Sequence, residues 1–325
     1  MSNDSPTARF PLFARFFWGM LLIGAIVASA STMMGILGKV NWRFDLFSHF
    51  RFQYFVYLAG VALLFLMGKQ RRSAIFAGIF AVVNAAAISP LILPAQQTDT
   101  SNTPYRLLLQ NVLTSNPNHD LLRNWILKND PDVVVLIEVN QRWLNDLALE
   151  NVGYSYNVEV PRPDNFGIAV YSKHPIVEHD ILFFSDFRVE NIAVTIDLGG
   201  TPMTVVGIHP PPPKRRDGAE FRNQHIRNAT AFAAMKNTPA IVAGDLNLTP
   251  FSPWFRTFTQ RSSLRSSQNG FGIQGTWPAQ LLPLFRIPID HVLISDEINV
   301  MTREVGPPIG SDHLGIILDF TLKAP

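Results

Sequence analysis

Three long apolar runs in the first hundred residues restrict the possible folds of this chain more than any other feature. They cover residues 16–38, 52–68 and 73–95, and none contains a charged residue. A helix needs roughly 17–25 apolar residues to cross the hydrocarbon core of a bilayer. Three such runs, separated by short basic loops, exceed what a soluble core needs. The sequence therefore predicts a membrane region over residues 1–95 with three transmembrane helices. The alternative is a set of buried helices in a soluble protein.

The orientation of these helices follows from the distribution of Lys and Arg, because cytoplasmic loops carry the excess. Five such residues lie before the first run or between the second and third, namely Arg9, Arg15, Lys69, Arg71 and Arg72. The loop between the first and second runs has three, together with Asp45. An odd number of spans then places the C-terminal part outside the cytoplasm, and we expect a bacterial inner or plasma membrane. Cleavage of the first run as a signal peptide after Ala28-Ser29-Ala30 would not change that side.

Charge and cysteine content narrow the chemistry of the rest of the chain. Residues 101–325 carry 19 Lys and Arg against 22 Asp and Glu, a formal charge near −3, whereas the first hundred residues are near +5. Nucleic acid normally meets a basic face, and the C-terminal part has no basic surplus. The chain has no cysteine, which excludes a thiol nucleophile, a thiolate zinc site and disulfide bonds.

A polar, turn-forming stretch at residues 96–104 predicts a linker, followed by one domain over residues 105–325. Helices are expected at residues 120–129 and 220–236. Strand-like runs are more numerous, at residues 105–109, 133–137, 166–172, 191–198, 203–208, 240–243, 291–295 and 314–322. Residues 191–198 alternate by two, as a half-buried strand does. The pattern predicts an α+β domain of packed sheets flanked by helices.

Short polar motifs accompany the ends of these apolar runs. They are Gln110-Asn111, Glu138, His209, Gly244-Asp245-Leu246-Asn247, Asp290-His291 and Ser311-Asp312-His313. Acidic, amide and imidazole groups at so many strand ends can converge on one sheet edge and hold a divalent cation and a phosphate. Burial of Glu138 after five apolar residues is costly unless a cation or hydrogen bonds compensate it. The motifs therefore predict a metal-dependent phosphoesterase.

In this order the motifs resemble those of the endonuclease/exonuclease/phosphatase superfamily, over about residues 105–322. The resemblance implies a deoxyribonuclease-I-like four-layer αββα sandwich, here preceded by three transmembrane helices. It also implies that Glu138 binds the metal, with Asn111 and Asp312 beside it. Oxygen ligands of this kind suit Mg²⁺, with Mn²⁺ as a substitute.

The resemblance further assigns roles at the phosphate. Asp245 orients and deprotonates the attacking water, and Asn247, facing the same way in an extended chain, donates to a phosphoryl oxygen. His313 is the second polar partner of the phosphate, and Asp290 holds its ring in one tautomer. A purely structural Asp-His pair at a strand start is the alternative for His313.

His209 corresponds to a histidine that the deoxyribonuclease-I and sphingomyelinase branches use in phosphate or leaving-group chemistry. The family histidine is usually paired with an acid, and the options in this chain are Glu159, Asp164 and Glu178. The position therefore favours those branches over the abasic-site endonucleases.

Two further segments are candidates for substrate binding. Four prolines from Pro210 favour a stiff polyproline-II segment, which would hold Lys214, Arg215 and Arg216 near the mouth of the site. The triplet is either a clamp for a phosphate or lipid headgroup, or a solvated basic loop. Trp277, in a Thr-Trp-Pro motif seen in some family members, either lines the cleft or packs in the core.

These expectations together describe a membrane-tethered, Mg²⁺-dependent phosphodiesterase or phosphomonoesterase, nuclease-like, that faces out of the cytoplasm. The substrate is a nucleic acid or a phospholipid or headgroup phosphate, and the anchor and His209 favour the lipid. The alternative outside the enzymes is an inactive binding or sensor module, against which the filled metal, amide, acid and histidine positions argue. The bilayer is the one partner that we expect besides the substrate.

Overall fold

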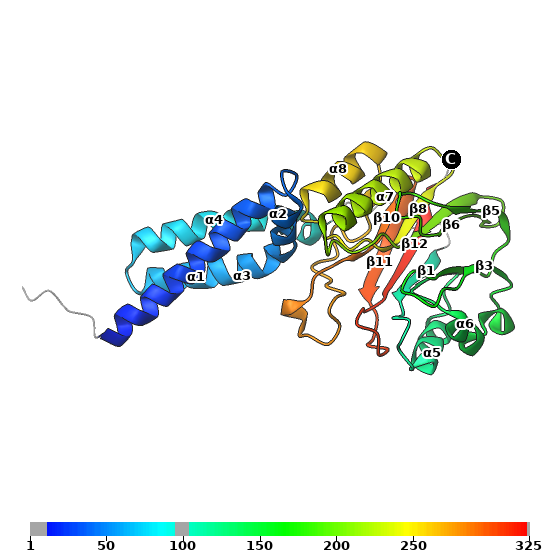
Figure 1. Ribbon diagram of the computed structural model, residues 1–325, viewed down its shortest axis with the longest axis horizontal. Coiled ribbons are helices and arrows are strands. Elements are labelled where there is room, and N and C mark those ends of the chain that lie inside the picture. The colour runs from blue at the N-terminus through cyan, green and yellow to red at the C-terminus, as the bar shows by residue number, and fades with distance from the viewer. Residues whose placement is uncertain (1–11, 95–103, 324–325) are drawn as a thin grey trace, which may run out of the picture.

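The computed structural model describes residues 12–94 and 104–323, which form an elongated helical part beside a larger part of mixed sheets and helices (Figure 1). The helical part contains α1 (Leu12–Ile36), α2 (Trp42–Leu46), the 3-10 helix η1 (Phe47–Phe50), α3 (Arg51–Met67) and α4 (Arg71–Ile92). Three segments are long and apolar enough to cross a membrane: Phe13–Ile36, Trp42–Met67 and Arg71–Ile92. The three predicted apolar helices are therefore present. Of the predicted linker, residues 96–103 lie outside the described residues.

Small side chains bring the three long helices together. Ala25, Ala28 and Ala77 are buried in one cluster with Leu58 and Phe65. Small residues let helix backbones approach closely where lipid supplies no hydrophobic drive for association. Large apolar side chains on the other faces of the helices are exposed, including Ile26, Leu63 and Ile79. The bundle thus has the distribution of side chains expected for helices surrounded by lipid.

The larger part contains two six-stranded sheets, with the strand orders β11-β12-β1-β2-β4-β3 and β5-β6-β7-β8-β10-β9. The strands are β1 (Tyr105–Asn111), β2 (Val133–Ile137), β3 (Tyr156–Val160), β4 (Ile168–Ser172), β5 (Ile176–Leu182), β6 (Asn191–Asp197), β7 (Pro202–Ile208), β8 (Ala240–Asp245), β9 (Arg265–Ser266), β10 (Asp290–Ile294), β11 (Ile298–Val305) and β12 (Ile316–Leu322). The helices are α5 (His119–Asn129), α6 (Gln141–Leu147), α7 (Arg216–Ala234), α8 (Pro253–Ser262), and the 3-10 helices η2 (Leu149–Val152) and η3 (Pro283–Phe285).

Three apolar layers hold this part together. Inward side chains of both sheets, such as Val135 and Val205, form the central layer. The opposite face of the first sheet packs against α5 and α6 through residues such as Trp143. The opposite face of the second sheet packs against α7 and α8 through residues such as Ile226 and Phe255. The predicted four-layer αββα sandwich is therefore confirmed.

The topology brings strand ends together at one edge. β1 and β2 are parallel neighbours joined through α5, and β7 and β8 are parallel neighbours joined through α7. Parallel neighbours end on the same side, so Asn111 and Glu138 lie close together, as do His209 and Asp245. β10 runs antiparallel to β8, with Asp290 opposite Asp245. The start of β10 therefore meets the end of β8.

The expectation that residues 191–198 form a half-buried strand was wrong in one respect. These residues form β6, but every residue from Asn191 to Ile196 is buried. Ile192 and Val194 face the layer between the sheets, whereas Ala193 faces the helical layer. Because the helices cover the outer face of this sheet, side chains on both faces of β6 are buried. The sequence of β6 alternates in polarity, but its burial does not alternate.

Three contacts join the short α2–η1 segment of the membrane region to the sandwich. Asp45 and Arg222 of α7 form a buried ion pair of 2.7 Å, and each is 1% exposed. Ser252 donates to the other oxygen of the same carboxylate at 2.6 Å. His49 Nδ1 lies 3.0 Å from Thr249 Oγ1. The membrane region is therefore packed directly on the sandwich through polar, buried groups.

Candidate active site

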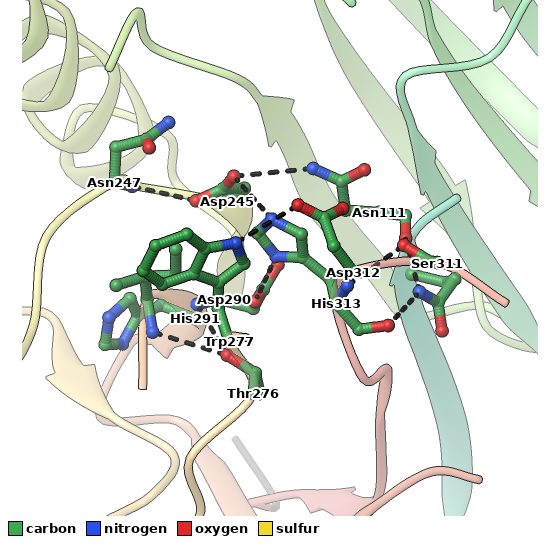
Figure 2. Close-up of polar contacts among 12 residues, drawn as sticks. Asn111, Asp245, Asn247, Thr276, Trp277, Asp290, His291, Ser311, Asp312 and His313 are labelled. Carbon is green, nitrogen blue, oxygen red and sulfur yellow. Dashed lines mark hydrogen bonds and ion pairs between the residues drawn. The ribbon is translucent and has the colours of Figure 1, made fainter. Parts of the chain in front are cut away.

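Asp290 and His313 form a direct side-chain contact in the site (Figure 2). His313 Nδ1 lies 2.9 Å from Asp290 Oδ2, and both residues are buried. Burial alone would lower the pKa of His313, but the carboxylates of Asp290 and Asp245 outweigh it and raise this pKa to about 10. The predicted pair is present, and His313 is a cationic donor at neutral pH.

Asp245 lies between two imidazoles at the end of β8. Its Oδ2 is 3.6 Å from His313 Nε2 and 3.6 Å from His209 Nε2. Burial raises the pKa of this carboxyl, but the two histidines more than offset that effect and hold the pKa below its usual value. Gly244 permits this arrangement, because a Cβ there would lie 1.8 Å from the carbonyl oxygen of Ile208. Asp245 is therefore an ionised acceptor facing the cleft.

Glu138 follows β2 in a left-handed backbone conformation, with φ of 66°. Its main-chain N–H donates to Gly167 O at 2.7 Å, and no side chain fits at Gly167, where a Cβ would lie 1.7 Å from Val139 O. The tight turn directs the carboxylate toward Asn111, whose Nδ2 donates to Glu138 Oε1 at 2.9 Å. Burial raises the pKa of Glu138, and the nearby His209 and the Asn111 hydrogen bond only partly counter this rise.

The residues present fit a divalent cation. Glu138 Oε2 is buried and has no hydrogen-bond partner among the described residues, so one carboxylate oxygen is free for a metal. Asp245, Asp290 and His313 also offer ligand atoms that lie within 4.8 Å of one another. Asn111 differs from expectation, because its Oδ1 accepts from Leu113 N at 3.1 Å and its Nδ2 faces the carboxylates. In this rotamer Asn111 orients Glu138 and does not present its amide oxygen.

Asp312 and Trp277 lie together at the mouth of the site. Trp277 Nε1 donates to Asp312 Oδ2 at 3.1 Å (Figure 2), and both side chains line a cleft that also contains Asp245 and His313. Trp277 thus lines the cleft, and its ring also fixes Asp312. Ser311 completes the motif, because its hydroxyl donates to Asn111 O at 2.7 Å and accepts from His313 N at 3.0 Å. The loop before β12 is thereby tied to the end of β1.

The three acids considered as partners of His209 lie elsewhere, so that expectation was wrong. They bind other side chains: Glu159 accepts from Tyr171, Asp164 pairs with Arg162, and Glu178 lies near Lys236. The acids close to His209 are instead Asp245 and Glu138, at 3.6 and 3.9 Å from Nε2. Burial lowers the pKa of His209, but Asp245 more than compensates and the net shift is upward. The acids near His209 come from the ends of other strands. Their separation along the sequence does not show that these strand ends lie together.

Asn247 also differs from the expectation of an extended chain. Its φ is 49°, and its N–H donates to Asp245 Oδ1 at 2.9 Å in an Asx turn. Its Nδ2 donates to Pro210 O at 3.2 Å, although Asn247 still lines the cleft. Asp245 and Asn247 therefore both line the cleft, but the turn directs their side chains differently from an extended chain.

The catalytic cleft has a volume of about 610 Å³ and includes residues that the sequence did not indicate. Glu138, His209, Asp245, Asp312 and His313 line it together with Lys214 of the basic triplet. Leu46, His49 and Phe50 of the membrane region complete its wall. No motif marks these three residues, because their position depends on how α2 and η1 pack on the sandwich.

Arg222 is a second contributor that the sequence did not indicate. Its Nη1 donates to the carbonyl oxygen of Asn247 at 3.1 Å, while its Nη2 pairs with Asp45. The guanidinium therefore connects the membrane region to the loop that carries Asp245 and Asn247. A single Arg within a helical run gives no sequence signal of such a role.

Comparisons with known proteins agree with this architecture. Residues 108–313 match the sequence model of the Endonuclease/Exonuclease/phosphatase family. No curated protein matches the chain in sequence. Among solved structures, an endonuclease/exonuclease/phosphatase from Beutenbergia cavernae DSM 12333 shares 21% identity with a TM-score of 0.57, over 68% of this chain and 72% of that chain.

Two further solved structures match this chain over their own full length. The human Nocturnin catalytic domain with bound sulfate anion has 20% identity and a TM-score of 0.56, covering 71% of this chain and 100% of that chain. D. rerio TDP2 complexed with single strand DNA product has 16% identity and a TM-score of 0.56, covering 68% and 100%. At these identities the likeness establishes the fold, and the matched family model covers most of the sandwich.

Proposed function

The chain belongs to the endonuclease/exonuclease/phosphatase family, and from this premise we propose that it is a membrane-tethered, Mg²⁺-dependent hydrolase of phosphate esters. The observation that carries the proposal is the Asp245 carboxylate between two imidazoles, one of them held by Asp290. A proton acceptor, Asp245, and a cationic donor, His313, then face the same cleft. Hydrolysis of a phosphate ester requires both.

In the proposed reaction, Asp245 orients a water molecule and accepts its proton. The water oxygen forms a bond to phosphorus, and the bond between phosphorus and the leaving oxygen breaks. His313, fixed by Asp290, donates to a phosphoryl oxygen, and Asn247 is the other donor at the cleft. His209 is placed to return a proton to the leaving oxygen, so that an alcohol and a phosphate are released.

The metal would be held by Glu138 through its free oxygen, with Asp312 and Asn111 beside it. When bound, a divalent cation neutralises phosphoryl charge and makes a water molecule more acidic. Mg²⁺ suits a set of carboxylate and amide oxygens, and Mn²⁺ is the plausible replacement. Asn111 would need to turn its amide to become a direct ligand.

The location and substrate class are parts of the same proposal. The three apolar helices anchor the enzyme, and the Lys and Arg distribution favours a sandwich outside the cytoplasm, as in the periplasm of a bacterium. The reaction is either nuclease-like phosphodiester hydrolysis or a sphingomyelinase-type action on phospholipids or headgroups. A TDP2 structure contains single-stranded DNA product, which favours the former for that protein. An inactive binding module is disfavoured because the acid, amide and histidine positions are all filled.

The test uses the full chain in detergent with methyl 4-nitrophenyl phosphate, a small soluble diester. Hydrolysis should require Mg²⁺ or Mn²⁺ and stop in chelator. Glu138→Gln should raise the half-saturating metal concentration at least ~10-fold. Loss of a residue that only hydrogen-bonds to a metal ligand already lowers metal affinity by about that factor, and Glu138 is the proposed ligand itself. Glu178→Gln, which removes an exposed acid of the same domain, is the matched control. Electron paramagnetic resonance of Mn²⁺ gives the affinity without turnover. Full activity in chelator would disprove metal dependence.

A further inference from the structure

The membrane region forms part of the wall of the catalytic cleft. Leu46, His49 and Phe50 line the cleft beside the catalytic groups, and α3 begins at the residue after Phe50. Phe50 is 41% exposed, whereas His49 is buried and lies within hydrogen-bond distance of Thr249. The cleft is therefore continuous with the end of a helix that is long and apolar enough to cross a bilayer. A molecule bound there lies at the membrane surface.

An exposed apolar loop lies beside the same helix. Leu281, Leu282, Leu284 and Phe285 are 46%, 70%, 38% and 54% exposed, and with Pro283 they form what we call the apolar loop. Gln53 of α3 donates from Nε2 to the main-chain oxygens of Leu284 and Arg286, at 2.9 and 3.1 Å. In Figure 1 this orange segment lies on the side of the sandwich nearest the helical bundle. Contiguous exposed apolar residues at such a place mark a membrane contact.

The apolar loop is joined to the cleft on both sides. Trp277 precedes it and Ile287 follows it, and both line the cleft. These two residues pair through their backbones, with Ile287 N donating to Trp277 O at 2.6 Å. Between the loop and Ile287, Arg286 donates to the main-chain oxygens of Leu281 and Ala279, at 2.7 and 3.0 Å, and so holds the loop against this wall of the cleft. The exposed side chains of the loop therefore lie a few residues along the chain from the cleft.

The lining of the cleft suits an amphiphile better than a nucleic acid. Beyond the catalytic groups it consists largely of apolar side chains, including Phe50, Phe166, Ile287 and Ile289. Lys214 is the one Lys or Arg among the described residues that line it. Nucleic acids are held mainly by basic contacts to several consecutive phosphates, and within the cleft itself Lys214 offers one such contact. One phosphate ester attached to an apolar group matches this surface.

A neighbouring cavity of about 740 Å³ adds attraction to an anionic membrane surface. Five basic side chains line it: Lys39 from the segment between α1 and α2, Arg43 of α2, and Lys214, Arg215 and Arg216 from the predicted triplet. Only Arg216 is paired with a carboxylate in the described salt bridges, at 2.9 Å from Glu220. Juxtamembrane basic clusters of this kind attract anionic lipids.

We propose that the substrate is a phosphate ester of a membrane lipid, which enters the cleft from the bilayer while its hydrocarbon chain stays against the apolar loop. The inference rests on the proposed phosphoesterase function and names its substrate class. The bond hydrolysed is the same P–O ester bond, and the lipid part contributes binding. Free nucleic acid is the competing class.

The kinetic test compares two esters that share the reacting bond. Methyl 4-nitrophenyl phosphate is soluble, and hexadecyl 4-nitrophenyl phosphate is presented in phosphatidylglycerol/phosphatidylethanolamine vesicles that hold the full chain. We expect kcat/KM to be at least ~10-fold higher for the hexadecyl ester. Leu282→Ser with Phe285→Ser should remove most of that advantage and leave methyl ester hydrolysis within about twofold, because burying one large apolar side chain is worth a factor of ten or more.

A matched control replaces exposed apolar side chains elsewhere on the sandwich. Val177→Ser with Met235→Ser, at positions 62% and 74% exposed, should leave both activities unchanged. The loop variant keeps its main-chain bonds to Gln53, so its folding is not at risk from their loss. Loss of the hexadecyl advantage in the control as well would overturn the role of the loop.

A second measurement needs no turnover. The chain has no cysteine, so Leu282→Cys carries a single environment-sensitive fluorophore. Spin-labelled lipids in the vesicles should quench it strongly, and a fluorophore at Met235→Cys should be quenched weakly. Equal weak quenching at both positions would overturn membrane contact by the loop.

The remaining outcomes separate the two proposals. Hydrolysis of the methyl ester with no preference for the hexadecyl ester would overturn the lipid inference and leave the phosphoesterase function intact. A higher kcat/KM on a single-stranded oligonucleotide than on the hexadecyl ester would do the same. Hydrolysis of neither ester and no oligonucleotide would overturn the phosphoesterase function itself.

Discussion

His313 is held by two carboxylates with different surroundings. Asp290 contacts its Nδ1 directly and has one oxygen with no partner among the described residues, whereas Asp245 lies 3.6 Å from its Nε2 and faces the cleft. An imidazole fixed on one nitrogen presents the other in a defined direction. Asp290 therefore acts through His313, and Asp245 acts on the substrate side.

This division predicts non-additive losses in a double variant. His313→Ala and Asp245→Asn should each lower kcat at least ~10²-fold, the usual scale for acid–base and oxyanion groups. Asp290→Asn should behave like a milder His313 lesion, and adding it to His313→Ala should cost little more, because the pair acts as one unit. The measurement is kcat on the methyl ester at saturating metal. Additive losses in the double variant would show that the two residues act independently.

His225 predicts how stability depends on pH. It is buried in α7, with Nε2 2.7 Å from Asn191 Oδ1, and burial lowers its pKa to about 3. Below pH 6.5 the unfolded chain binds a proton at this position that the folded chain does not. Stability is therefore fully present above pH 6.5 and falls toward pH 3, by at most about 1.4 kcal/mol per pH unit from this group.

The check is thermal unfolding in detergent at pH 7.5 and pH 5. Replacing His225 by Gln keeps a polar side chain near Asn191 but removes the titration, so the difference in melting temperature between the two pH values should shrink. His179→Gln, on the exposed strand β5, is the matched control. An undiminished difference in His225→Gln would assign the acid sensitivity to other groups.

The sequence indicated most of the side chains that meet at the candidate site, because strand ends are visible as polar residues after apolar runs. Asp245, Asp290 and His313 meet as the motifs suggested. The partner of His209 was not found, since it lies on a strand that neighbours β7 in space, and Asn247 turned out to be left-handed. Pairing between distant strands and local turn geometry are not encoded in a motif.

At the scale of elements, the apolar helices and the strands with continuous apolar runs were predictable from those runs, but β11, the longest strand among the described residues, was not predicted. Amphipathic α6 and α8 and the exposed strands β3 and β5 were not, because their short runs are mixed with polar residues. The packing of α2 and η1 on α7 was also not predictable. It depends on Asp45 and Arg222, which are separated by most of the chain yet form one buried ion pair.

This ion pair predicts separate effects on stability and turnover. Arg222→Met leaves Asp45 buried without its cation and should cost about 3–5 kcal/mol, whereas Asp45→Leu combined with Arg222→Met should recover most of that loss. Turnover of the methyl ester should stay low in the double variant, because the carbonyl of Asn247 has lost its donor. Urea unfolding in detergent and kcat give the two readouts. Recovery of kcat together with stability would make the pair purely structural.

At the scale of the whole molecule, the helical bundle has one end at the sandwich and one end far from it. In Figure 1 the turn between α3 and α4 lies far from the sandwich, whereas α2 and η1 pack against it. Lys69 lies in that far turn, and Arg71 and Arg72 begin α4 there, so these three basic residues and the sandwich lie at opposite ends of the bundle. Positive residues favour the cytoplasmic side, which supports the proposed location of the sandwich outside the cytoplasm.

Labelling of single cysteines tests this orientation, and the absence of native cysteine makes the background clean. In intact spheroplasts, a membrane-impermeant maleimide should react with Met235→Cys on the sandwich and not with Gln70→Cys in the basic turn. Both positions should react after the membrane is opened, which controls for accessibility. The reverse pattern would place the sandwich in the cytoplasm and would show that the Lys and Arg distribution does not determine the orientation of this bundle. Because the cleft and the apolar loop lie at the sandwich end of the bundle in either case, reversal would change which leaflet supplies the lipid and leave the bilayer as its source.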